Sequence, residues 1–206
     1  MTQTQAAPPR LEFLFDFGSP NAYLAHKVLP ALAARTGATV DYQPVLLGGV
    51  FKATGNRSPM EAFGGVPAKL AYEARERDRF VARHGLTRFA PNPHFPVNTL
   101  AIMRGAVAAR RLGVFEPYVE AVFAAMWEQG LKMDDPAVIG EALVAAGLPA
   151  PEVMGLTQDP AVKAELVDAT NAAVARGVFG SPSFFVGEEL WFGKDRLDDI
   201  ERALRL

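Results

Sequence analysis

The chain has 206 residues, of which 50% are hydrophobic and 21% are charged, and its formal net charge is −2. This composition is ordinary for a packed soluble protein with one large domain, or with one domain that carries an insertion. The small net charge gives no electrostatic case for nucleic acid or an anionic membrane as a partner.

Two absences narrow the chemistry and the location further. The chain contains no cysteine, which excludes disulfides, thiolate zinc sites and dithiol exchange. Any thiol that the protein uses must therefore arrive as a ligand. The first ten residues lack the apolar core of a signal peptide, and no apolar run approaches the ~20 residues of a membrane span. We therefore expect a cytoplasmic protein.

The predicted elements begin with a strand over residues 11–17, whose apolar side chains point to both faces and should be buried. Ser19 and Pro20 then provide an N-cap and a first helical residue for a helix over residues 20–35. A second strand over residues 40–46 completes a β-α-β unit, whose parallel crossover should be right-handed.

The middle of the chain changes to helical periodicity. It follows a long connection over residues 48–59, which is expected to be a loop and lacks the Gly-Lys-Ser/Thr ending of a phosphate-binding loop. Glycine and proline residues then divide the sequence into five predicted helices. These helices cover residues 67–84, 99–112, 115–129, 136–146 and 160–176.

The end of the chain returns to strands. Residues 183–186 and 189–192 flank a short turn that contains glycine, and this pattern predicts a β-hairpin. Residues 195–206 predict a closing helix, with Asp195 or Lys194 near its cap.

This order of elements is typical of an α/β protein with a thioredoxin-like fold that is split by an all-helical insertion. We expect residues 11–59 and 177–206 to form the thioredoxin-like domain and residues 60–176 to form the helical insertion domain. Residues 1–10 should be a flexible N-terminus. Such a fold places the start of its first helix opposite the proline that precedes its third strand.

Ser19 is the first candidate site residue, at the position where redox proteins of this fold carry a cysteine. One interpretation is a plain N-cap, which any serine before a helical proline provides. The other is an anion site, because a hydroxyl and free backbone N–H groups at a helix N-terminus favour negative charge. A thiolate is such an anion, and unperturbed thiols titrate near ~8.5.

Two segments near the C-terminus are candidates for holding a peptide-like ligand. Pro182 precedes a strand, and we expect the Ser181–Pro182 bond to be cis; the alternative is an ordinary loop proline. The Ser181 backbone would then pair with an extended ligand as an added strand does. Residues 192–196 either cap the last helix or recognise an ammonium through Asp195 and a carboxylate through helix N–H groups.

Polar residues elsewhere have two interpretations each. Lys52 and Asn56 are either solvated loop residues or polar contacts above an active site. The proline-rich segment over residues 90–98 is either a rigid spacer in which Asn98 caps the next helix, or the wall of a pocket for a small ring. The three histidines lie far apart in the sequence without metal-ligand spacing, so no metal site is expected.

Taken together, these motifs resemble the 2-hydroxychromene-2-carboxylate isomerases, relatives of the kappa-class glutathione transferases and of DsbA-like proteins. The resemblance runs from about residue 11 to residue 204. It is carried by the segments Asp16–Pro20, Gly55-Asn56, Pro91–Arg104, Gly177–Pro182 and Phe192–Leu197.

The resemblance implies glutathione as the cofactor and a small aromatic acid as the substrate. It places Ser19 at the glutathione sulfur and Ser181 at the cysteinyl backbone. The γ-glutamyl end would be held by Phe192, Gly193, Lys194 and Asp195. The aromatic substrate would be lined by Lys52, Asn56, Val97 and Asn98.

The implied reaction interconverts 2-hydroxychromene-2-carboxylate and trans-o-hydroxybenzylidenepyruvate. Reversible addition of a glutathione thiolate would turn a double bond into a single bond about which the substrate rotates. Ser19 would hold the sulfur anion, and a cation such as Lys52 would counter the substrate's carboxylate or enolate. Two alternatives stay open: a kappa-like glutathione transferase that acts on another electrophile, and a non-catalytic module that binds thiols or peptides. A homodimer is also an open alternative.

Overall fold

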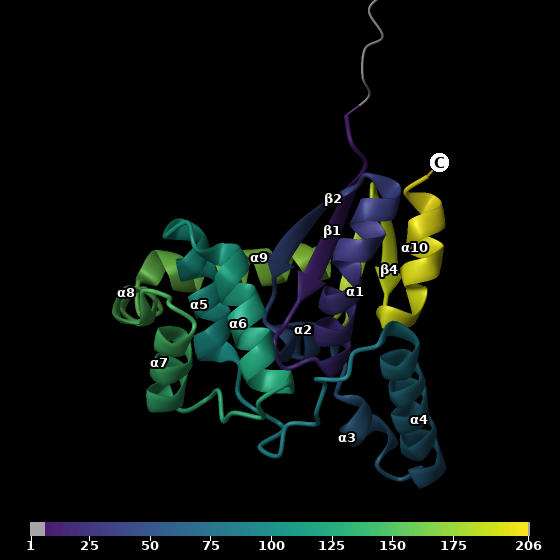
Figure 1. Cartoon of the computed structure of the whole chain (residues 1–206), viewed down its shortest axis with the longest axis horizontal. Coiled ribbons are helices and arrows are strands. Elements are labelled where there is room, and N and C mark those ends of the chain that lie inside the picture. The colour runs from purple at the N-terminus through teal and green to yellow at the C-terminus, as the bar shows by residue number, and fades with distance from the viewer. Residues whose placement is uncertain (1–6, 206) are drawn as a thin grey trace, which may run out of the picture.

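The structure, a computed structural model, describes residues 7–205 and is built around one four-stranded sheet (Figure 1). The strand order is β2-β1-β3-β4, where β1 and β2 are parallel and the other neighbours are antiparallel. The strands are β1 (Arg10–Phe15), β2 (Thr39–Pro44), β3 (Ser183–Val186) and β4 (Glu189–Phe192). Of the expected flexible N-terminus, residues 1–6 lie outside the described residues, and Arg10 opens β1.

Strand β1 is central because its side chains are apolar on both faces. Leu11, Phe13 and Phe15 belong to the larger core, and Leu14 belongs to a second core on the other face of the sheet. Each of these side chains is at most 2% exposed. The predicted two-sided burial of this strand is therefore confirmed.

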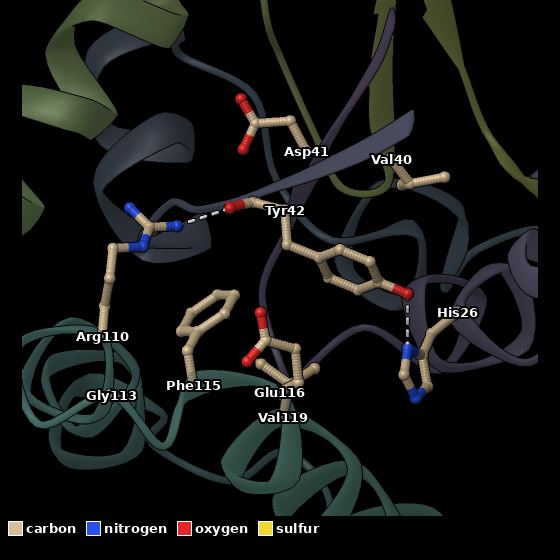
Figure 2. A pocket seen from close by; sticks show the side chains of 9 residues that line it. All are labelled: His26, Val40, Asp41, Tyr42, Arg110, Gly113, Phe115, Glu116 and Val119. Atoms are coloured by element: carbon tan, nitrogen blue, oxygen red, sulfur yellow. Dashed lines mark hydrogen bonds between the residues drawn. The ribbon is translucent and has the colours of Figure 1, made fainter. Parts of the chain in front are cut away.

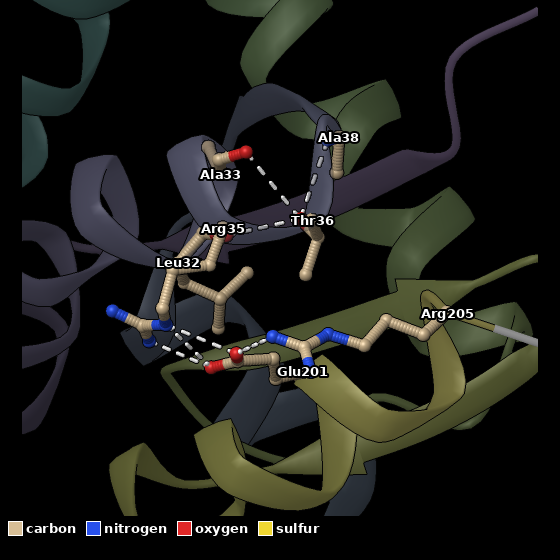
Figure 3. A network of polar contacts seen from close by, with 7 residues as sticks. All are labelled: Leu32, Ala33, Arg35, Thr36, Ala38, Glu201 and Arg205. Carbon is tan, nitrogen blue, oxygen red and sulfur yellow. Dashed lines mark hydrogen bonds and ion pairs between the residues drawn. The ribbon is translucent and has the colours of Figure 1, made fainter.

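Helix α1 (Pro20–Thr36) follows β1 and lies against the same face of the sheet as the short C-terminal helix α10 (Leu197–Ala203) (Figure 1). It begins at the predicted N-cap, Ser19, and ends at Gly37, whose φ of 71° lies in the left-handed region that glycine favours. Polar contacts join the C-terminal ends of the two helices. Glu201 accepts hydrogen bonds from Arg35 and Arg205, with both Nη2–oxygen distances at 2.6 Å (Figure 3).

The helices between β2 and β3 form three groups, and Figure 1 shows their arrangement. A bundle of α5 to α8 lies beside the sheet, with α6 next to α1, and α3 and α4 extend as a separate arm. Helices α2 and α9 pack on each other against the second face of the sheet. Their bounds are α2 (Leu47–Thr54), α3 (Pro59–Phe63), α4 (Pro67–His84), α5 (Leu100–Arg111), α6 (Phe115–Trp127), α7 (Pro136–Ala145), α8 (Ala150–Leu156) and α9 (Pro160–Ala175).

The predicted order of elements, a β-α-β unit, a helical block and a β-β-α end, is confirmed, but the loop prediction over residues 48–59 is wrong. Residues 47–54 form α2 and residues 59–63 form α3. A Cβ atom added at Gly49 would lie 3.2 Å from Thr170 Cγ2 of α9. The glycine that locally suggests a loop thus lets α2 pack closely on α9.

The start of the last helix also differs from the prediction. It opens with a short 3-10 turn (Lys194–Arg196), and neither this turn nor α10 has a side-chain cap. Asp195 lies inside the 3-10 turn and so does not cap it. Its carboxylate accepts a hydrogen bond from the Lys194 ammonium, with an Nζ–Oδ1 distance of 2.5 Å. Helix α8 is absent from the sequence prediction. Within residues 7–205, no helix has the length and apolar character that crossing a membrane requires.

Candidate active site

Ser19 and Ser181 meet at the N-terminus of α1, although they lie far apart in the sequence. The Ser19 hydroxyl donates a hydrogen bond to the Ser181 carbonyl at 2.8 Å, and it accepts one from the Ala22 N–H at 3.2 Å. Both serines are buried. The first turn of α1 contains no acidic residue, so no carboxylate within it opposes an anion at this end of the helix.

The Ser181–Pro182 bond is cis, as predicted. The Pro182 carbonyl accepts a hydrogen bond from the Gly193 N–H at 3.0 Å, which brings the segment after β4 next to Ser181. Gly193 has a φ of 92°, a value that other residues rarely adopt. The structure thus joins the helix start, the proline turn and the segment of residues 192–195 around one point.

Two aromatic rings flank this point. Phe179 and Phe192 are 41% and 43% exposed, and their ring centroids are 4.6 Å apart. Gly180 lies beneath the Phe192 ring, because a Cβ atom added there would come within 2.8 Å of it. The glycine therefore leaves the space that Phe192 occupies over the backbone before Ser181.

Lys194 and Asp195 differ in what they offer to a ligand. The Lys194 side chain is 4% exposed, and its ammonium lies 4.9 Å from the centroid of the Phe80 ring on α4. The Asp195 side chain is 65% exposed and uses one carboxylate oxygen for Lys194. Asp195 can thus face a ligand, whereas Lys194 orients Asp195 from below.

The residues predicted to line the aromatic substrate lie on two other segments. Asn56, just after α2, donates from Nδ2 to the Phe179 carbonyl at 2.8 Å, which ties this loop to the segment before Ser181. Lys52 is exposed near the end of α2, and no residue between 7 and 205 forms an ion pair with it. Val97 is buried, and the side-chain oxygen Oδ1 of Asn98 accepts a hydrogen bond from the Leu100 N–H at 3.0 Å.

Sequence reasoning did not single out Asp16, which lies fully buried at the base of this site. Its carboxylate accepts hydrogen bonds from the backbone N–H groups of Gly18 and Leu47 and from the Thr99 hydroxyl. Burial raises the pKa of the Asp16 carboxyl above its usual range, against the opposing effect of these three donors. The available signal was a charged residue between two phenylalanines of an apolar run.

A separate concavity lies at the free edge of β2 and contains none of the predicted site residues (Figure 2). It measures about 440 Å³. Arg110 stacks on Phe115 and donates from Nη2 to the Tyr42 carbonyl at 2.5 Å, while Tyr42 Oη lies 2.8 Å from His26 Nδ1. The hydrogen bond from Arg110 thus satisfies a backbone carbonyl at the edge of the sheet, which hinders addition of another strand. Among the described residues, no cluster of metal-binding side chains occurs.

Comparisons with known proteins show the family to which the chain belongs. The model of the DSBA-like thioredoxin domain matches residues 10–205. The chain is 31% identical to 2-hydroxychromene-2-carboxylate isomerase of Sphingobium xenophagum, over 94% of this chain and 97% of that protein. It is 27% identical to glutathione S-transferase kappa 1 of Homo sapiens, over 96% and 91%. A solved structure of 2-hydroxychromene-2-carboxylate isomerase matches with a TM-score of 0.78 and 30% identity, over 95% of this chain and 94% of that one.

Proposed function

Because the chain belongs to the DSBA-like thioredoxin domain family and to the family of the 2-hydroxychromene-2-carboxylate isomerases, we propose that it is a glutathione-dependent isomerase. Its reaction interconverts 2-hydroxychromene-2-carboxylate and trans-o-hydroxybenzylidenepyruvate. The observation that carries the proposal is the pairing of Ser19, at a helix N-terminus, with the Ser181 carbonyl next to a cis proline. In a chain without cysteine, this pairing suits a thiol that comes from a ligand.

The groups around Ser19 fit a thiol-containing peptide. Within residues 7–205, the N–H groups of Asn21 and Ser181 have no hydrogen-bond acceptor. The Asn21 N–H adds a donor at the positive end of α1, where an anion is favoured. The N–H and carbonyl of Ser181 suit the backbone of an extended ligand, as in the addition of a strand.

Binding requires an exchange of hydrogen bonds, because the Ser19 hydroxyl has one proton and gives it to the Ser181 carbonyl. A ligand N–H that pairs with this carbonyl frees the hydroxyl to donate to the sulfur. Ser19 therefore holds the sulfur anion and does not act as the nucleophile. When bound, glutathione supplies a thiolate that adds reversibly to the conjugated double bond of the substrate.

The two ends of the site then have separate tasks. The exposed carboxylate of Asp195 suits the ammonium of a γ-glutamyl group, and Lys194 holds that carboxylate in place. Phe192 and Gly193 form the adjacent surface. On the other side, Lys52 would counter the negative charge of the aromatic acid.

The remaining contacts to the aromatic substrate would come from the loop after α2 and from the start of α5. Asn56 already ties its loop to the carbonyl of Phe179. Val97 and Asn98 lie in the segment just before α5, separated from it by Thr99. These two segments would form the wall that faces the substrate ring.

The relationship to glutathione S-transferase kappa 1 favours a second candidate, a glutathione transferase that acts on another electrophile. An assay of ring opening, with glutathione present or absent, separates the two functions. Turnover that needs glutathione and consumes none of it supports the isomerase. A stable glutathione conjugate would instead indicate a transferase.

The matched control for this assay is S-methylglutathione, which keeps the peptide and lacks a free thiol. It should compete with glutathione and support no turnover. Equal turnover without glutathione would contradict the thiol mechanism. Tight binding of glutathione without any turnover would indicate a non-catalytic thiol-binding module.

A further inference from the structure

Asp16 brings together three segments that are distant in the sequence. The Gly18 N–H donates to Oδ1 at 2.8 Å, and Oδ2 accepts from the Leu47 N–H at 2.7 Å and from the Thr99 hydroxyl at 3.1 Å. The carboxylate is fully buried, and within residues 7–205 no cation pairs with it. Hydrogen bonds alone therefore stabilise the ionised form of this side chain.

Each donor belongs to a segment that carries part of the proposed site. Gly18 lies in the turn directly before Ser19, Leu47 is the first residue of α2, and Thr99 directly precedes α5. Helix α2 with the loop after it, and the segment just before α5, carry the residues proposed to face the aromatic substrate. One carboxylate thus joins the thiol side of the site to the substrate side.

The backbone of Asp16 adds a fourth segment. Its N–H donates to the Ser181 hydroxyl at 3.0 Å, and its carbonyl accepts from the Ser19 N–H at 3.0 Å. Both serines proposed to contact glutathione are therefore bonded to Asp16. A shift of its carboxylate would change the distance between these serines and the opposite wall.

We infer that Asp16 is a positioning residue, which sets the Ser19–Ser181 wall against the wall made by α2 and the start of α5. This inference rests on the proposed function. A reaction between two bound molecules depends steeply on their relative placement, and a displacement of about 1 Å can cost a hundredfold in rate. Binding of either molecule alone is far less sensitive to that placement.

The energetics separate this role from a purely structural one. A buried carboxylate without a cation destabilises the fold, and a neutral residue of the same shape relieves that cost. Burial accordingly raises the pKa of Asp16. Removing the charge should therefore affect stability and activity differently.

The test is Asp16→Asn, which keeps the size of the side chain and replaces one oxygen with an NH2 group. That group must face at least one of the backbone donors, Gly18 or Leu47. We expect kcat at saturating glutathione and substrate to fall by about ten- to a hundredfold. The glutathione dissociation constant and the substrate KM should stay within about twofold of wild type. The thermal midpoint should change little, because the relief of the buried charge offsets the lost hydrogen bond.

A second pair of variants guards against a misfolded Asp16→Asn protein. Thr99→Val removes one of the three donors at constant shape, and Thr99→Ser keeps the hydroxyl. We expect Thr99→Val to lower kcat in the same manner and to a smaller extent, and Thr99→Ser to retain wild-type kcat.

The outcomes separate this inference from the proposed function. If the wild-type protein shows no glutathione-dependent turnover, the proposed function fails and the inference fails with it. If the wild-type protein is active, unchanged kcat in Asp16→Asn and Thr99→Val overturns the inference alone. A lower thermal midpoint with unchanged kcat of the folded fraction would likewise show that Asp16 is only structural.

Discussion

Replacing Ser19 with alanine removes one donor and one acceptor at the centre of the proposed thiol site. The Ser181 carbonyl loses its 2.8 Å hydrogen bond, and the Ala22 N–H loses its 3.2 Å acceptor. The second loss is that of an N-cap, worth about 1 kcal/mol of folding stability. If the hydroxyl also holds a sulfur anion, the variant loses about 1–3 kcal/mol of transition-state stabilisation, or about 5- to 150-fold in kcat/KM.

The direct assay measures thiolate absorbance in the ultraviolet while glutathione is titrated with and without protein. We expect the wild-type protein to lower the thiol pKa of bound glutathione below its usual ~8.5. Ser19→Ala should reverse that shift by about one to two units, which is the same energy expressed as a pKa. The shift and the loss of rate should appear together, because one hydrogen bond causes both.

A matched control separates capping from catalysis. Asp159 caps α9 and accepts hydrogen bonds from the N–H groups of Ala161 and Val162. Asp159→Ala should therefore lower thermal stability by a similar amount and leave kcat/KM unchanged. The reasoning about the thiol is refuted if wild-type protein leaves the glutathione titration curve unshifted at saturation, or if Ser19→Ala matches Asp159→Ala in activity.

Further substitutions test the two walls of the site, the acid stability and the packing of the bundle. Asp195→Ala should weaken glutathione binding and leave the KM for the aromatic acid unchanged, and Lys52→Ala should do the reverse. Each loss should be about 1–3 kcal/mol, measured by steady-state kinetics with one ligand varied at a time. Hydrogen bonds from His26 and then Lys27 lower the pKa of Glu120 to about 2, so Glu120→Gln should reduce the stability lost as the pH falls from about 5 to 2, measured by denaturant unfolding. Gly105→Ala should destabilise by about 1–3 kcal/mol, measured by thermal unfolding, because the new Cβ would lie 2.0 Å from a buried tyrosine hydroxyl.

Each of these predictions can be contradicted by a specific result. Asn98→Ala should behave as Lys52→Ala does, and equal effects of Asp195→Ala and Lys52→Ala on one ligand would rule out two separate walls. The sign for Glu120 follows from its lowered pKa, since its ionised form stabilises the fold above its unfolded pKa and that contribution disappears on protonation. If the stability lost between about pH 5 and pH 2 is the same in Glu120→Gln as in wild type, this prediction is wrong. Gly155→Ala is the control for Gly105, because no atom beyond its chain neighbours and the backbone of its own helix lies within 4 Å of its added Cβ.

Local signals in the sequence determined several elements to the residue. Ser19 followed by Pro20 predicted the start of α1, and two short strand-like runs on either side of a glycine turn predicted both strands of the hairpin at their observed bounds. The prediction of α4 over residues 67–84 is likewise confirmed. These predictions succeed because a cap, a helix-ending glycine and a hairpin turn act over a few neighbouring residues.

Only the tertiary structure decided where the remaining elements form and how the site is assembled. Helix α2 contains Gly48 and Gly49, which weaken a helix in isolation, and it packs closely on α9 through Gly49. Asp195 turned from a predicted cap into the partner of Lys194.

The role of Asp16 illustrates the physical reason most clearly. Its carboxylate is satisfied by donors from three segments, and two of them follow it by 31 and 83 positions. Ser19 and Ser181 likewise meet across 162 positions of the chain. Residue type and local spacing predicted that Ser19 lies at a helix start. That it donates to Ser181 above a buried carboxylate depends on long-range packing of the sheet and helices, which no short window of sequence contains.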